Sequence, residues 1–171
     1  MGETFRVILL IALTAAFLTT GALMLSWWME PERRLKRALL KSLGAKADTE
    51  ALSPAEGRAA GLDFDGGQVV VLWKRGSQGL VYAVDEVEGG EIIVDGHVVA
   101  RARRGALRKD LDVVVPEAEQ VVLRLMFSDT RSPEFELALW NADLPASTGS
   151  PTEALRLGRR WLSHVEALMK R

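Results

Sequence analysis

The residues best suited to recognise a charged ligand form a run of five cations between positions 101 and 109. They are Arg101, Arg103, Arg104, Arg108 and Lys109. Such a cluster suits an anionic lipid headgroup or an acidic protein surface, and Gly105 could let the backbone approach a phosphate. Cations of this kind also occur on solvated strand edges, where they deter pairing with another strand. The run is therefore a candidate patch for an anion or a protein partner, with the solvated edge as the alternative.

Acidic side chains gather just before this run, at Asp85, Glu86, Glu88 and Glu91. A calcium loop needs ligands at fixed alternating positions around a glycine turn, and this segment lacks that spacing. We therefore predict no metal here. We expect these carboxylates to pair with the basic run, within one molecule or between two.

No set of residues in the sequence indicates catalysis. The chain has no cysteine, which excludes disulfides, thiolate metal sites and cysteine nucleophiles. Neither histidine, His97 or His164, has an evident serine-plus-acid constellation, and nucleotide-binding glycine motifs are absent. The sequence thus predicts a non-enzymatic protein with no catalytic residue, no cofactor and no metal.

Positive and negative charges nearly cancel over the chain. Its 171 residues include 22 Lys and Arg against 23 Asp and Glu, which gives a net charge of −1. A broad basic surface for nucleic acid is therefore not expected. The length suits one domain with its own core behind an N-terminal segment.

The N-terminal segment has the composition of a membrane anchor. Residues 7–29 carry no charge and would form a helix about 34 Å long, against a hydrocarbon core of about 30 Å. Trp27 and Trp28 end the run, where indole rings favour the headgroup level. We predict a transmembrane anchor over residues 1–30. A cleaved signal peptide, with a small-residue site at residues 20–22, is the alternative.

The flanking charges predict the orientation of this anchor. Five cations follow the apolar run closely, at Arg33, Arg34, Lys36, Arg37 and Lys41. The positive-inside rule then places the N-terminus outside and the following domain in the cytoplasm, as in a single-pass protein of a bacterial inner membrane. Small residues repeat every four positions at Ala12, Ala16 and Thr20, which favours close contact with another transmembrane helix.

A basic amphipathic helix is expected over residues 31–44. Leu35, Leu39 and Leu43 would share one face, and cations the opposite face. Beside a membrane span, such a helix lies among lipid headgroups; alternatively, its leucines pack on the following domain. Residues 45–60 are rich in Ala, Ser, Pro, Glu and Gly and are interpreted as a linker.

Residues 61–171 have the pattern of a small antiparallel β-rich domain that ends in a helix. About seven short strands are expected, with Asp95-Gly96 as the strongest hairpin signal. They are residues 68–73, 79–84, 91–94, 97–101, 111–115, 120–127 and 134–140. A capping box at residues 150–153 starts an amphipathic helix whose apolar face includes Trp161.

This order of elements loosely resembles small bacterial membrane-anchored proteins with a pleckstrin-homology-like domain. The resemblance implies an α+β fold in which a bent barrel of about seven strands is capped by the C-terminal helix. A plain sandwich with the helix on one face is the alternative. Because unrelated functions share this fold, the resemblance transfers no activity.

The architecture as a whole predicts a protein-interaction role. We expect the cytoplasmic domain to bind membrane lipids and another membrane protein, as an accessory, assembly or scaffold subunit of a membrane complex. The alternative is a membrane-tethered sensor or binding module for a small ligand or an anionic lipid headgroup.

Overall fold

The chain has an α+β fold with two antiparallel sheets. The computed structural model describes residues 2–28, 30–111, 117–144 and 149–170, although not every side chain of the first helix. Its helices are α1 (Gly2–Trp28), α2 (Pro31–Leu43), α3 (Pro151–Met169) and the short 3₁₀ helix η1 (Val84–Glu86). The strands within those ranges are β1 (Thr49–Ser53), β2 (Arg58–Asp63), β3 (Gln68–Trp73), β4 (Gln78–Ala83), β5 (Val87–Val94), β6 (His97–Arg103), β7 (Lys109–Asp110), β8 (Gln120–Phe127) and β9 (Glu134–Asn141).

The first sheet is a meander in the order β1-β2-β3-β4. Four residues, 74–77, join β3 to β4, and Gly76 adopts the left-handed conformation there with φ of 77°. A Cβ at this position would lie 2.7 Å from the Cβ of Ala38, so only glycine allows α2 to approach the turn so closely.

The second sheet has the order β7-β6-β5-β8-β9. Asp95 and Gly96 join β5 to β6 with φ of 47° and 80°, as a two-residue hairpin requires. The Asp95 carboxylate also accepts hydrogen bonds from the backbone N–H groups of Glu119 and Gln120, which ties this hairpin to the start of β8.

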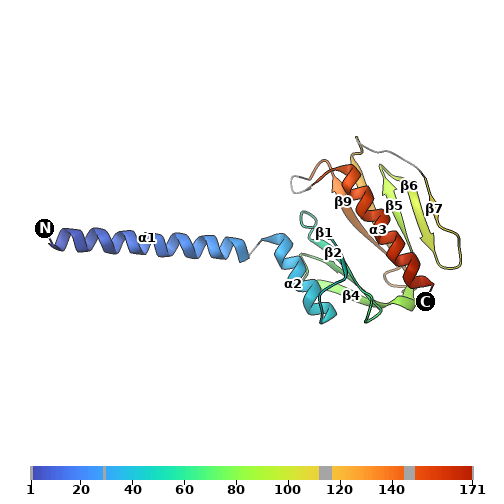
Figure 1. Cartoon of the computed structure of the whole chain (residues 1–171), viewed down its shortest axis with the longest axis horizontal. Helices are drawn as coiled ribbons and strands as arrows, with labels where there is room; N and C mark the ends of the chain where they lie inside the picture. The colour runs from blue at the N-terminus through green and yellow to red at the C-terminus, as the bar shows by residue number, and fades with distance from the viewer. Residues whose placement is uncertain (1, 29, 112–116, 145–148, 171) are drawn as a thin grey trace.

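The main core lies between the two sheets and α3, which crosses the second sheet (Figure 1). Its buried side chains come from both sheets and the helix, with Leu62 and Val71 in the first sheet, Leu123 in the second and Trp161 in α3. Ser150 caps α3 by accepting from the backbone N–H of Glu153, and the Glu153 carboxylate accepts from the N–H of Ser150. The capped amphipathic helix is present as predicted.

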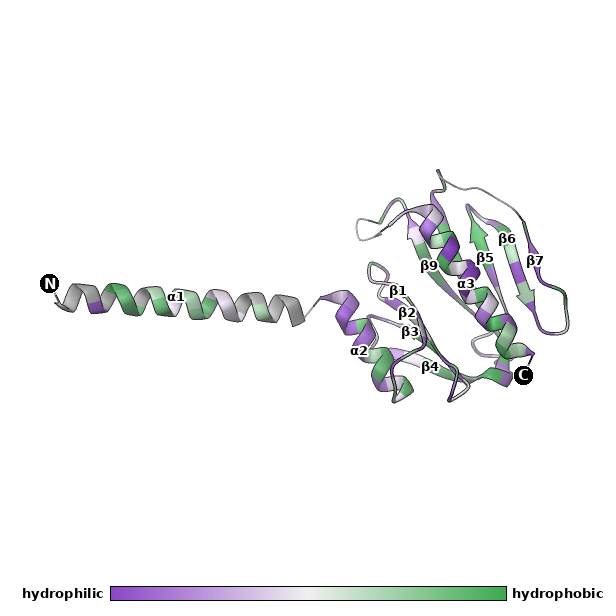
Figure 2. Cartoon of the chain, in the orientation of Figure 1, coloured by the Kyte–Doolittle hydropathy of each residue, from purple (hydrophilic) through white to green (hydrophobic). Residues whose placement is uncertain are grey.

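Helix α2 packs on the outer face of the first sheet. Leu35 and Leu39 are each 1% exposed and contact Ala59, Val70 and Leu72. Polar and apolar residues mix along α2, as Figure 2 shows, and its buried residues are Leu35 and Leu39. Leu35 and Leu39 therefore pack on the domain, as one of the two interpretations of this helix expected, whereas Leu40 is 50% exposed.

The predicted membrane anchor is not supported. The apolar N-terminal run does form α1, but within the described residues no helix is both long and apolar enough to cross a membrane. A span needs about 20 consecutive, mostly apolar residues. The longest stretch of α1 with described side chains, residues 12–21, includes three threonines. Hydroxyl groups lower its hydropathy, although each of them donates to a carbonyl oxygen four residues earlier, at 2.8 Å.

This finding contradicts three linked predictions. They are the transmembrane part of the fold class, the description as a single-pass membrane protein, and the inner-membrane location with an outer N-terminus and a cytoplasmic domain. All three rested on the apolarity of residues 7–29 and on the cations that follow.

The β-rich domain begins earlier than residue 61. The predicted linker, residues 45–60, contains β1 and the start of β2, which pair in register from Thr49 with Leu62 to Ser53 with Arg58. The described residues hold nine strands in two sheets, against about seven predicted. β1 was missed because alanine and serine have low strand propensity, and packing against the rest of the sheet overrides it. The strand expected at residues 111–115 falls largely outside the described residues.

Candidate functional site

Four of the five cations of the predicted patch, the arginines, have partners within the protein. Arg101 and Arg103 lie 2.7 and 3.5 Å from the Glu91 carboxylate. The Arg104 guanidinium donates to the carbonyl oxygens of Val84 and Val87, at 3.0 and 2.9 Å. Because their partners are on β5 and η1, these arginines of β6 and the following turn link the second sheet to η1.

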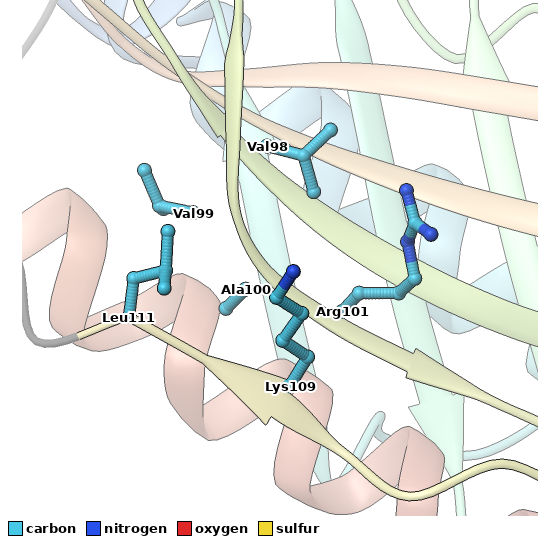
Figure 3. A pocket seen from close by; sticks show the side chains of 6 residues that line it. All are labelled: Val98, Val99, Ala100, Arg101, Lys109 and Leu111. Atoms are coloured by element: carbon cyan, nitrogen blue, oxygen red, sulfur yellow. The ribbon is translucent and has the colours of Figure 1, made fainter.

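Arg108 also has protein partners, and only Lys109 of the run does not. Arg108 donates to Asp110 and to the hydroxyl of Ser163, both at 2.8 Å. Lys109 takes part in no ion pair among the described residues. It lines a cavity of about 80 Å³ with Val98, Val99, Ala100, Arg101 and Leu111 (Figure 3). Ligand sites are usually about 300–1,000 Å³, so this cavity is smaller than a typical site, and the anion patch stays a prediction.

Glu91 is the centre of the charge network on the outer face of the second sheet. Its side chain is 3% exposed and contacts Arg124 on β8 at 3.2 Å, in addition to the two arginines of β6. For Glu91, the expected pairing of acidic and basic segments is confirmed. Arg124 also binds Glu136 at 2.6 Å, and this hydrogen bond raises the pKa of the guanidinium further.

The sheets differ in how their edges are protected. β1 lies near β9, whose Ala138 N–H donates to Glu56 at 3.4 Å, so this edge is closed by the second sheet. β7 is two residues long and carries Lys109 and Asp110, so it is short and charged. β4 is six residues long, contains no charged residue and, within the part of the chain that the structure describes, pairs only with β3. Proteins usually blunt such an edge with charge, proline or a bulge, and β4 has none of these.

The backbone of β4 is open at Gly79 and Val81. Val84 donates to the carbonyl oxygen of Gly67 at 2.9 Å, which marks these two residues as a hydrogen-bonded pair in the register of β3 and β4. Bonded and non-bonded pairs alternate in antiparallel strands. The N–H and C=O groups of Gly79 and Val81 therefore point away from β3. The next outward N–H, of Ala83, is already bonded to the Glu86 carboxylate at 2.8 Å.

A groove of about 310 Å³ runs between this open strand and α2. Val81 is 49% exposed in it, and Gly79 contributes no side chain. The two elements lie next to each other in Figure 1. The lining residues are Ala38, Lys41, Ser42, Val70, Leu72, Gly76, Ser77, Gln78, Gly79, Leu80 and Val81. The groove thus combines the exposed side chain of Val81 with backbone groups of β4 that point away from β3.

The charge around this groove is positive. Lys41 lines it, and Arg34 of α2 lies beside the turn, since a Cβ at Gly76 would be 4.0 Å from the Arg34 carbonyl oxygen. Lys74 and Arg75 belong to the same turn. None of these four cations forms an ion pair with another described residue. The groove therefore favours an acidic partner.

The remaining cations of α2 have partners along the helix. Arg33 contacts Glu30 at 2.6 Å, and Arg37 donates to the carbonyl oxygen of Arg33. Lys36 contacts Glu32 at 2.7 Å and Glu50 at 3.5 Å, and the hydrogen bond that it donates to Glu32 is the main cause of its raised pKa. Together with the buried leucines, these contacts describe a helix docked on the first sheet.

The residues predicted for contacts of α1 remain predictions. Ala12, Ala16 and Thr20 are exposed on α1, and the Thr20 hydroxyl donates to the Ala16 carbonyl oxygen. Trp27 and Trp28 lie at the end of α1, and their side chains are outside the described part of the structure.

His164 packs against Phe64 with 5.0 Å between ring centroids. No metal-binding group of acidic or histidine side chains occurs among the described residues.

The open edge of β4 was missed in the sequence. Its signal is the uncharged segment Gln78-Gly-Leu-Val-Tyr-Ala83, which has no charged residue between the cations of the preceding turn and Asp85. That segment predicts a strand, but which strand forms the edge of a sheet depends on the pairing of distant segments.

Comparisons with protein-family models, with curated proteins and with solved structures found no match for this chain. Any function must therefore be inferred from the geometry of the chain itself.

Burial of Tyr82 predicts a pH dependence of stability. Desolvation, and then the nearby Asp129 carboxylate, raise the pKa of this phenol above its ordinary value of 10. The folded state therefore keeps the proton at a pH where the unfolded chain has lost it. The free energy of unfolding is expected to fall as the pH rises above about 10. Denaturant unfolding at pH 9 and at pH 10.5 measures this fall, which should be larger for wild type than for Tyr82→Phe. Equal losses of unfolding free energy in the two proteins would contradict the prediction.

Proposed function

We propose that this chain is a non-enzymatic protein-interaction module that binds an extended segment of a partner protein along β4. The partner segment would add a fifth strand to the first sheet, as in other cases of strand addition to an open edge. The observation that carries the proposal is the unpaired backbone at Gly79 and Val81 beside the groove under α2. A role as an accessory or scaffold subunit of a larger complex is consistent with this.

The groove also defines the chemistry of the partner. Side chains alternate along a strand, so every second residue of the added segment would lie on the α2 side of the sheet, beside the exposed Val81. These residues should be apolar. An antiparallel segment would bring its C-terminal end to the turn at residues 74–77, where the cations favour acidic residues. We therefore expect an extended apolar segment followed by acidic side chains.

Replacing Val81 with proline tests strand addition directly. Proline removes the outward N–H and adds bulk at the edge, but it breaks no bond to β3, because this N–H points away from that strand. Peptides selected from a random displayed library against the whole chain serve as probes. We expect their affinity for Val81→Pro to be lower by about tenfold or more, since strand hydrogen bonds are lost. Titration calorimetry measures it.

Val81→Thr is the matched control, because threonine keeps the backbone N–H and the strand propensity. It should retain binding within about threefold, a difference of under 1 kcal/mol. Amide exchange at Gly79 and Val81 should slow when a peptide binds. Peptides that bind Val81→Pro as tightly as wild type would refute the proposal. A wild-type dimer in sedimentation that Val81→Pro dissociates would assign the edge to a second copy instead.

A further inference from the structure

A second hollow opens on the other face of the first sheet, where the two sheets diverge. Its volume is about 230 Å³. Side chains from both sheets and the loop before β9 line it: Arg58, Val71, Trp73, Leu80, Tyr82, Ser132, Glu134, Phe135 and Glu136. Trp73, Leu80 and Phe135 are partly buried and adjoin the main core, so the hollow is an open end of that core. We call it the inter-sheet cleft.

Three charged residues line this cleft, and Arg58 is the cation among them. Arg58 continues the inward row of β2, since Ala60 and Leu62 on the same side belong to the main core. Its guanidinium donates to the backbone carbonyl oxygen of Glu136 at 2.8 Å and forms no ion pair with a described residue. The carboxylates of Glu134 and Glu136 instead bind Arg124, at 3.6 and 2.6 Å, on the opposite face of the second sheet.

The aromatic side chains form walls whose polar atoms are already engaged. The Trp73 indole N–H donates to Gln78 at 3.0 Å. Tyr82 stacks on Phe127 with 3.9 Å between ring centroids, and its hydroxyl lies 3.3 Å from both Asp129 and the Ser132 carbonyl oxygen. The cleft therefore offers apolar ring surface and a single cation, which is the composition of a site for an amphipathic anion.

We propose that the inter-sheet cleft binds a small aromatic carboxylic acid. Its ring would lie among Trp73, Leu80 and Phe135, and its carboxylate would accept hydrogen bonds from Arg58. The volume is slightly below the usual range of about 300–1,000 Å³, which suits an acid of one or two rings and is too small for a nucleotide.

This site is separate from the partner groove. Leu80 and Tyr82 point toward the core, whereas Gly79 and Val81 lie on the face of α2, because neighbouring residues of a strand face opposite sides. The Val81→Pro variant should therefore bind the acid as wild type does. Failure of one proposal leaves the other standing.

Two probes of equal shape test the role of charge: 2-naphthoate and its neutral analogue 2-naphthamide. Calorimetry with the whole chain should show naphthoate binding about tenfold more tightly, because a hydrogen bond to a charged group is stronger. The Trp73 indole N–H signal should shift in the NMR spectrum. Equal affinities for the two probes, or shifts confined to other residues, would overturn the proposal.

Variants then assign the preference to Arg58. Arg58→Gln should bind both probes equally, whereas Arg160→Gln, which removes an exposed arginine of α3, should keep the wild-type preference. Trp73→Leu should weaken both probes by a similar factor and leave their ratio unchanged, which distinguishes the ring contact from the charge contact. If Arg58→Gln loses its native amide spectrum, Arg58→Lys replaces it and should retain a reduced preference. A preference that survives in Arg58→Gln would refute the site.

Discussion

Replacing Trp161 with alanine is expected to lower the free energy of unfolding by about 3–5 kcal/mol. The side chain is fully buried, at 0% exposure, and belongs to the core cluster that joins both sheets to α3. Leu123 and Leu137 of the second sheet and Val71 of the first are in the same cluster. A cavity at this position would therefore loosen all three layers at once.

Denaturant unfolding of the whole chain, followed by circular dichroism, measures this loss. Trp161→Phe should cost less than alanine, because most of the ring volume stays and the indole N–H, which has no hydrogen-bond partner among the described residues, is removed. Arg160→Ala, at the neighbouring exposed position, should change stability by no more than about 0.5 kcal/mol. A loss below about 1 kcal/mol for Trp161→Ala would mean that α3 does not hold the core.

The elements with strong local signals could be predicted from the sequence. Helix α3 follows from the capping box at Ser150 and from the spacing of its apolar residues, and α2 from Pro31 and the leucines four positions apart. The hairpin of β5 and β6 follows from Asp95-Gly96. In each case the residues that decide the conformation are close together in the chain, so no knowledge of distant pairing was needed.

Features that depend on distant contacts were missed or misassigned. β1 has weak strand residues and is a strand because it pairs with β2 and packs its Ala51 in the core. The pairing of the basic run with Glu91 was expected from the sequence, whereas the contact of Arg108 with Ser163 on α3 was not, because it depends on where α3 packs. Both the open edge of β4 and the inter-sheet cleft arise only once the two sheets are assembled.

Replacing Glu91 with alanine is expected to lower the free energy of unfolding by about 2–3 kcal/mol. Removing one member of a buried ion pair costs about 3–5 kcal/mol when the remaining charge is left buried. Here the three arginines around Glu91 have side chains that are 43%, 51% and 29% exposed, so solvent screens part of their repulsion. The cost should therefore fall at or below the lower end of that range.

Two glutamine variants separate the effect of the Glu91 charge from the effect of its side-chain volume. Glu91→Gln keeps the side-chain volume and should lose less unfolding free energy than Glu91→Ala. The difference in stability between Glu91→Gln and wild type should shrink in high salt, because salt screens the arginines from one another. Glu88→Gln, at an exposed position of the same strand, should be within about 0.5 kcal/mol of wild type. If the two glutamine variants are equally stable at low salt, the carboxylate of Glu91 does not organise the outer face of the second sheet. Arg101, Arg103 and Arg124 would then be held apart by the sheet alone, and the basic run would again be available to an external anion.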